Sequence, residues 1–280
     1  MSEAVLFLGP ALVMCIFIAS IHVYLGLHIL EREVIFVDLS LAQLAALGTI
    51  VFTLLGHHQE DIWPHAGAFG FTILGAAIFA LAGRARQHVS QEAVVGIVYA
   101  VASALMILVL SRAPHGAEQM KNALVGSLLV SSWRQAWVVG GAYLLLGTAH
   151  MFLARRFIRL SWEPDIAEQT IPHVAWWDFG FYVLFGIVIT ISVQVAGVLL
   201  VFSYLIVPAV ITKIFSENVT TRLLAGWGVA VIASVAGLWA SWNWDLPTGS
   251  TVVVAFGVLL VAAGSVRWLV TIRRGHFPRR

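Results

Sequence analysis

Apolar runs about as long as a membrane span recur along the whole sequence and constrain the fold more than any other feature. A helix needs about 20 apolar residues to cross the hydrocarbon core of a bilayer. The 280 residues are 60% hydrophobic and only 11% charged, whereas soluble domains are about 45–50% apolar and about 25% charged. One soluble core could not bury this much apolar surface. The sequence therefore predicts an all-α, polytopic integral membrane protein with about nine transmembrane helices, within a range of eight to ten.

The spans are expected to form a single transmembrane domain over residues 1–280, because no linker or long polar stretch separates them. We divide the long run 174–212 near Gln194 and Gly197, since it exceeds one span. The segment 122–132 is too short to cross the bilayer, and a re-entrant course would require it to be buried in protein. The expected spans are 4–29, 34–55, 66–83, 93–111, 135–153, 174–192, 196–212, 223–240 and 250–271.

The positions of the basic residues predict the orientation. With the C-terminus in the cytoplasm and nine crossings, thirteen of the 16 Lys and Arg residues fall on the cytoplasmic side. Only Arg112, Lys121 and Arg134 fall outside. Cytoplasmic loops of membrane proteins are enriched in these residues, so we expect the N-terminus outside and the C-terminus in the cytoplasm. The formal net charge of +2 gives no indication of a nucleic-acid partner.

Several catalytic motifs are absent from the sequence. A phosphate-binding P-loop ends in Gly-Lys-Ser/Thr, but neither Lys121 nor Lys213 follows a glycine. HExxH, GxSxG and CxxC are also missing, and Cys15 is the only cysteine. These absences argue against an enzyme and indicate a protein that moves its substrate rather than transforming it.

Five segments together resemble the permease subunit of the ABC-3 family, the zinc, manganese and iron importers of bacterial inner membranes. They cover nearly the whole chain in the family's order. The segments are VIFVDLSLAQLAALG at 34–48, QEAVVGIVYA at 91–100, LVGSLLVS at 124–131, VAGVLLVFSYLIVPA at 195–209 and DLPTG at 245–249.

The resemblance implies a type II importer-like permease in the bacterial inner membrane. Such a permease works as a homodimer or as a pair of permeases, bound to cytoplasmic ABC ATPase subunits that hydrolyse the ATP. An extracytoplasmic protein delivers the divalent metal ion, which is cargo rather than a permanently bound cofactor. Alternating access would carry the zinc, manganese or iron ion across the membrane.

The second span departs from the family signature Gly-Asp-Ala-Leu-Ser-His-Ala, whose Asp and His lie four residues apart on one helix face. Aligned through Gly48, Gln43 replaces the His, and the acid is Asp38, five residues earlier. Five residues turn a helix by a net angle of about 140°, which separates the two side chains. Asp38 and Gln43 remain metal-pathway candidates, because a carboxylate inside a span is costly and usually functional. The alternatives are a helix-capping role for Asp38 and helix packing for Gln43.

Two outer segments carry side chains of the kind that bind divalent metals. Either they form an entry path for metal or they are solvated loops. The candidates are His57, His58, Glu60, Asp61 and His65 in the first, and His115 and Glu118 in the second. Two further pathway candidates are Gln194, near the break between spans six and seven, and Asp245, which is otherwise a turn residue.

The polar turn at 212–222 is cytoplasmic in the predicted topology. In permeases of this kind, the resemblance implies that this turn couples to the ATPase. The coupling candidates are Lys213, Ile214, Phe215, Glu217 and Arg222. The alternative is a plain connecting loop.

Two other functions stay open at this point. A stand-alone secondary transporter or channel for a cation would need more buried acids than Asp38 and Asp178, and Asp178 is otherwise a residue at the start of a helix. An electron-transfer subunit could bind haem through paired histidines, and His22, His28 and His150 lie on apolar helices. We expect these histidines to be hydrogen-bonded inside the bundle.

Overall fold

The computed structural model describes residues 2–58, 61–84, 89–111, 126, 128 and 131–273, and these form an all-helical bundle without strands. Nine of the described helices are long and apolar enough to cross a membrane, which confirms the expected number. The helices are α1 (Ser2–Arg32), α2 (Val37–Leu54), α3 (Ile62–Arg84), α4 (Gln91–Leu110), α6 (Trp133–Trp162), α7 (Pro164–Thr170), α8 (Val174–Ala196), α9 (Val198–Phe215), α10 (Val219–Trp244) and α11 (Thr248–Arg273).

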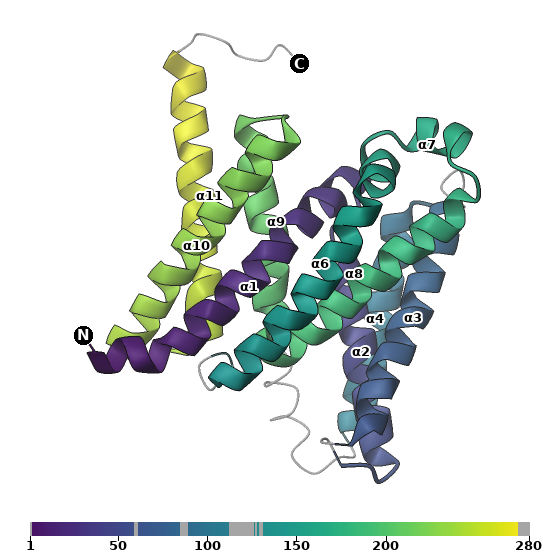
Figure 1. The fold of residues 1–280 in the computed structure, drawn as a ribbon, viewed down its shortest axis with the longest axis horizontal. Coiled ribbons are helices and arrows are strands. Elements are labelled where there is room, and N and C mark those ends of the chain that lie inside the picture. The colour runs from purple at the N-terminus through teal and green to yellow at the C-terminus, as the bar shows by residue number, and fades with distance from the viewer. Residues whose placement is uncertain are drawn as a thin grey trace.

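The division of the run 174–212 is confirmed. α8 ends at Ala196, and Gly197 has a φ of 77°, in a region that glycine enters without a steric penalty. The chain reverses there, and α9 runs back beside α1 (Figure 1). The largest difference from expectation follows the fifth predicted span, where α6 extends to Trp162 rather than 153 and α7 follows as a separate short helix.

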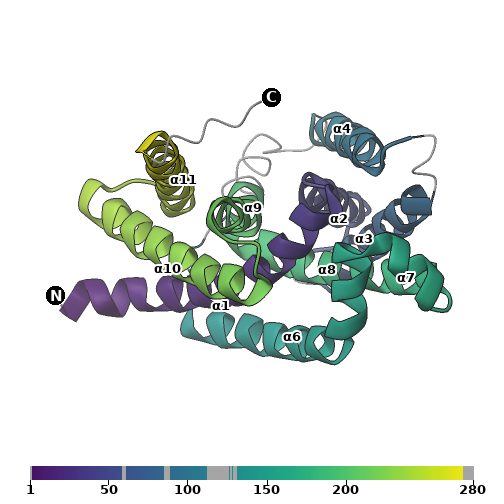
Figure 2. The ribbon, with the colours of Figure 1, turned by 90° about the horizontal axis from the view of Figure 1, so that it is seen from above.

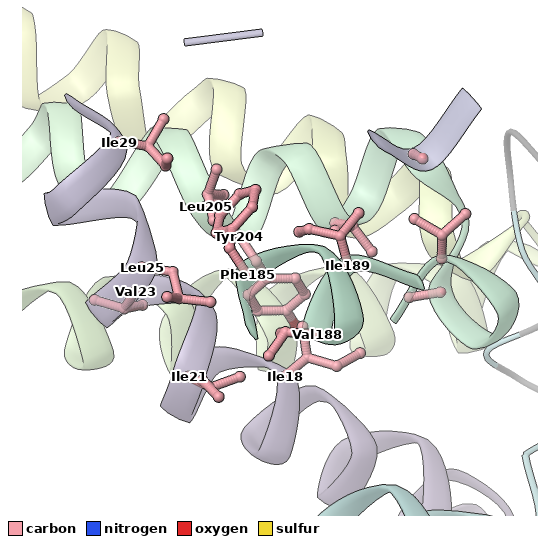
Figure 3. Packing of buried hydrophobic residues seen from close by; sticks show 14 of the residues in the cluster. Ile18, Ile21, Val23, Leu25, Ile29, Phe185, Val188, Ile189, Tyr204 and Leu205 are labelled. Atoms are coloured by element: carbon pink, nitrogen blue, oxygen red, sulfur yellow. The ribbon is translucent and has the colours of Figure 1, made fainter. Parts of the chain in front are cut away.

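α1 lies at the centre of one half of the bundle, in contact with α6, α9 and α10 (Figure 2). Its apolar side chains interlock with those of α8 and α9, where Ile18 and Leu25 lie close to Phe185 and Leu205 (Figure 3). At Gly26 a Cβ atom would lie 1.9 Å from the carbonyl oxygen of Leu205. Only glycine therefore permits the close approach of α1 and α9.

The other half of the bundle pairs α2 with α3 and α4, and α3 with α8. α4 and α11 lie at opposite edges of one face, with α9 and α2 between them (Figure 2). The ends of α1, α6, α9 and α11 that we expect in the cytoplasm lie at the same end of the bundle as α7 (Figure 1). This arrangement brings the predicted coupling turn and the start of α2 to one end of the molecule.

Candidate functional site

A tight turn after α1 positions the carboxylate of Asp38. Glu33 adopts a φ of 58°, and the N–H of Val34 donates to the carbonyl of Ile29, so the chain reverses within a few residues. α2 then begins at Val37 and places Asp38 in its first turn. The carboxylate thus lies just inside the second span, as the sequence predicts.

Asp38 is buried, with only 1% of its surface exposed, and its Oδ1 atom has no hydrogen-bond partner among the described residues. Glu92, in the first turn of α4, is close enough to repel it electrostatically. One oxygen of Glu92 accepts from the N–H of Phe36 at 3.3 Å, and its Oε2 has no described partner. Two carboxylates, each with an oxygen atom that lacks a described partner, therefore lie near each other at the starts of α2 and α4. Among the described residues, neither carboxylate has an ion-pair partner that would neutralise it, and such a site suits a cation.

Sequence reasoning missed Glu92, although the segment 91–100 that contains it was singled out. The contact depends on how α4 packs on α2. The Ser40 hydroxyl donates to the carbonyl of Val95 at 2.8 Å and fixes that packing. An acidic residue in the first turn of a helix is common because it stabilises the helix. The position of Glu92 in the sequence therefore does not indicate that it lies near Asp38.

Gln43 is also buried, at 3% exposure, and its Oε1 atom lacks a described partner. It lies five residues beyond Asp38 on the same helix. The amide of Gln91 contrasts with it, because that amide donates to the carbonyl of Phe79 at 2.9 Å and to the Tyr182 hydroxyl at 2.8 Å. Gln91 joins helices, whereas the Gln43 oxygen is left available to a ligand.

The last turn of α1 carries a cluster of paired charges. Glu31 accepts from the Lys213 ammonium at 2.8 and 2.9 Å and from the Arg222 guanidinium at 2.6 Å. The Arg222 side chain is fully buried, at 0% exposure, and the Lys213 side chain is 39% exposed. Glu31 thereby ties the end of α9 and the start of α10 to α1.

Arg32 makes a second buried ion pair, which joins α1 to α8. Its guanidinium donates to Asp178 at 2.5 Å and to the Ser161 hydroxyl at 2.8 Å, and it lies 4.0 Å from the centre of the Phe181 ring. Asp178 is the fifth residue of α8, so it acts through this pair rather than as a residue that starts the helix. Sequence reasoning did not connect Arg32 with Asp178 because they are 146 positions apart.

The five coupling candidates divide into two groups. Lys213 and Arg222 point inward to Glu31, as described above. Ile214 is half-buried, while Phe215 and Glu217 are exposed at the turn between α9 and α10. Only Phe215 and Glu217 of the five coupling candidates are therefore exposed, fewer than the sequence predicted.

α7 is a surface element that sequence reasoning missed. It lies between α6 and α8 at the end of the bundle that we expect in the cytoplasm (Figure 1). Ala167 is fully buried and anchors it, while Ile166 is 50% exposed and Glu168 is exposed. Seven residues are too few for an amphipathic period to stand out from the polar loop.

The histidine-rich loop before α3 is described only in part, because Glu60 lies outside the described residues. His58 and His65 are exposed, and the His57 ring lies 5.8 Å from that of Trp63. Asp61 accepts from the N–H of His58 at 2.8 Å and so closes the turn before α3. Within the part of the chain that the structure describes, no three His, Cys, Asp or Glu side chains group closely enough to hold a metal ion.

The remaining candidates occupy different places. His115 and Glu118 lie outside the described residues. Gln194 is exposed in the last turn of α8, one residue from the buried Val195. Asp245 is exposed and ends α10 with a φ of 50°, and its N–H donates to the carbonyl of Ser241. A turn role therefore accounts for Asp245 structurally.

The three histidines on apolar helices are all buried, at 2% exposure or less. His22 Nδ1 bonds to the carbonyl of Ile18, and His28 Nδ1 bonds to the Ser161 hydroxyl, each at 2.8 Å. Both ring nitrogens of His150, in contrast, lack a partner among the described residues. The expected hydrogen bonding is thus present for two of the three.

Comparisons with known proteins agree with this architecture. The model of the ABC 3 transport family matches residues 4–267. The manganese import system permease protein ScaB of Streptococcus gordonii is 21% identical over 92% of this chain and 90% of its own length.

Two solved structures share the fold. The PsaBC complex from Streptococcus pneumoniae, with a bound Fab, matches with a TM-score of 0.74 and 20% identity, over 92% of this chain and 90% of that one. An inward-facing structure of a putative metal-chelate type ABC transporter matches with a TM-score of 0.68 and 17% identity, over 94% and 88% of the two chains.

Proposed function

Because the chain belongs to the ABC 3 transport family, we propose that it is the membrane permease subunit of an ATP-driven importer of divalent metal ions. The family match over residues 4–267 is the observation that carries this proposal, since it covers all nine candidate spans except a few terminal residues. Manganese is the first metal to test, because the S. gordonii relative is named as a manganese import permease. Zinc and iron are the other candidates.

The proposed pathway passes the inner ends of α2 and α4. Asp38 supplies a buried carboxylate, Glu92 adds a second, and Gln43 offers a neutral amide oxygen farther along α2. Oxygen ligands suit Mn²⁺ better than they suit zinc, which is held mainly by nitrogen and sulfur. The replacement of the usual His by Gln43 is consistent with this preference. His57, His58, His65, His115, Glu118, Gln194 and Asp245 remain proposed contacts on the outer half of the route.

The ATPase is proposed to dock at the end of the bundle that carries α7 and the turn between α9 and α10. Phe215 and Glu217 supply exposed contacts there, together with Ile166 and Glu168 of α7. Lys213 and Arg222 act behind this surface, because their ion pairs with Glu31 transmit a movement of the turn to α1. A second permease, a cytoplasmic ATPase pair and an extracytoplasmic metal-binding protein complete the proposed importer.

Reconstituted vesicles test the proposal directly. The chain is co-expressed with its ATPase subunit, and ⁵⁴Mn²⁺ uptake is measured in the presence of the metal-loaded binding protein. We expect uptake that requires ATP and stops when the Walker A lysine of the ATPase is replaced. Uptake that continues with the ATPase disabled would show a secondary transporter or channel instead and would overturn the proposal.

A further inference from the structure

A long groove lies along the surface of α1, between α6 and α10. It encloses about 870 Å³, which lies within the range of small-molecule binding sites. Ile16 and Ile21 of α1, Leu144 and Met151 of α6, and Leu223 and Trp227 of α10 form most of its apolar wall. None of its lining residues is charged. All three helices are candidate spans, so this groove lies at membrane depth.

The chain does not fill the groove itself. On the α6 side, a Cβ atom added at Gly141 or Gly147 would meet no other atom within 4 Å. Leu144 and Met151 beside them are 70% and 78% exposed. The open volume is thus bounded by glycine backbone and by side chains that have contacts on one side only.

Most polar side chains that line the groove are already hydrogen-bonded to the protein. The hydroxyls of Ser20 and Thr148 donate to the carbonyls of Phe17 and Leu145 in their own helices. The Tyr143 hydroxyl bonds to Ser192, and the indole N–H of Trp227 donates to the carbonyl of Ser20 at 3.1 Å. These groups need no ligand.

The Tyr24 hydroxyl and the His150 ring differ because their polar atoms are buried without such a bond in the part of the chain that the structure describes. The Tyr24 hydroxyl and both ring nitrogens of His150 have no partner among the described residues, and both side chains line the groove. His150 is only 2% exposed, and the two rings lie 5.7 Å apart, centre to centre. A buried polar group without a partner costs free energy, and more so in hydrocarbon, where no water can replace the missing bond. Two such groups side by side indicate a ligand that bonds to both.

We propose that this groove binds an uncharged membrane amphiphile, with a hydroxyl or carbonyl head against Tyr24 and His150 and an apolar tail along α1. A neutral tyrosine and a neutral histidine can each donate to or accept from such a head. A charged head is disfavoured because it would be buried without a counter-ion among the lining residues. His150 also lies five residues, or about 7.5 Å of helix rise, before Arg155. The head group therefore lies deeper in the membrane than Arg155, whose side chain would lie at the level of the lipid phosphate groups.

The ligand would fill the space between α6 and the pair α1 and α10. It would thus stabilise α6 against the same helix whose last turn carries the ion pairs of Glu31 and Arg32. This role is independent of the transported metal and of the ATPase.

Quantitative lipid analysis of the purified protein tests the proposal. The chain is washed extensively in detergent, its lipids are extracted, and neutral lipids and phospholipids are measured by mass spectrometry per mole of protein. We expect the wild type to retain one class of neutral lipid at close to one molecule per chain. The double variant Tyr24→Phe and His150→Leu should retain at least tenfold less.

A second variant and a control separate this loss from misfolding. Gly147→Leu should also remove the lipid, because its side chain enters open space in the groove rather than the packed core. Thr271→Val should retain it, because that hydroxyl is bonded within α11 and does not line the groove. Size-exclusion profiles identify variants that fold. A wild-type chain with only host phospholipids in membrane proportions, or folded Gly147→Leu with its neutral lipid intact, would overturn the proposal.

Discussion

The end of α1 and the start of α2 are neighbours in the chain, but within the described part of the molecule the charged side chains of the first are ion-paired and that of the second is not. At the end of α1, Glu31 pairs with two cations and Arg32 pairs with Asp178. At the start of α2, Asp38 is more deeply buried than Glu31 or Asp178 but has no ion pair among the described residues, and the nearby charge is the like charge of Glu92.

We propose that this difference separates charges that stabilise the fold from charges that bind the transported ion. A buried ion pair joins two helices, and the loss of one partner leaves a charge stranded in a medium of low polarity. A buried carboxylate without a pair makes no such connection, so its retention in a membrane span needs another reason. Stability should therefore depend on the first group and transport on the second.

The largest effect is expected from Asp38→Asn. Metal uptake in reconstituted vesicles should be abolished, because the variant loses the charge that attracts a cation. The free energy of unfolding should fall by no more than about 1 kcal/mol, since only a charge near the α2 N-terminus is lost. Vesicle uptake and denaturant unfolding in micelles measure the two quantities.

Glu33→Gln is the matched control for this substitution. Glu33 is exposed in the turn just before α2, at the same end of the bundle, and its variant should transport normally. Normal uptake by Asp38→Asn would show that the buried carboxylate only stabilises the helix start. Our proposed pathway would then be wrong.

Asp178→Asn, in contrast to Asp38→Asn, should mainly lower the stability of the protein. The Arg32 side chain is 2% exposed, and removing its counter-ion should lower the free energy of unfolding by about 3–5 kcal/mol. Denaturant unfolding in micelles measures this loss. Asp165→Asn, at an exposed position in the first turn of α7, should lose no more than about 1 kcal/mol. The double variant Arg32→Met and Asp178→Leu should recover most of the loss, because it strands no charge. No recovery would mean that the pair is not the source of the effect.

A smaller loss, of about 2–3 kcal/mol, is expected from Glu31→Gln. Lys213 can turn to solvent, but the fully buried Arg222 cannot. The additional change Arg222→Gln should restore stability, and Glu217→Gln, exposed in the same turn, should have no effect. Thermal unfolding of the purified chain measures all three. If Glu31→Gln unfolds like the wild type, Glu31 does not anchor the turn between α9 and α10.

The spans could be predicted from the sequence because each depends on local composition alone. Hydrophobicity over about 20 residues specifies a membrane helix without reference to its neighbours. The break at Gly197 was equally local, since the run was too long and contained a glycine. α7 was missed for the same reason, because seven residues between two spans carry too little pattern.

The contacts at the site could not be predicted in the same way. Asp38 was identified because an acid in a span is unusual by itself. Glu92 and the pair of Arg32 with Asp178 depend on how distant helices pack, and no local pattern encodes that. Lys213 and Arg222 were expected to face a partner for the same reason: their positions showed a charged turn but not the Glu31 carboxylate beneath it.

The smallest effect is expected where two buried amides are compared. Gln43→Leu removes an oxygen without a described partner, so the free energy of unfolding should rise by about 1 kcal/mol while uptake falls severalfold. Gln91→Leu removes two hydrogen bonds between helices and should lower it by about 1–3 kcal/mol. Denaturant unfolding and initial uptake rates of both variants measure the contrast. If Gln43→Leu loses stability as Gln91→Leu does, or transports at the wild-type rate, then Gln43 is a packing residue, and the free oxygen on α2 belongs to Asp38 alone.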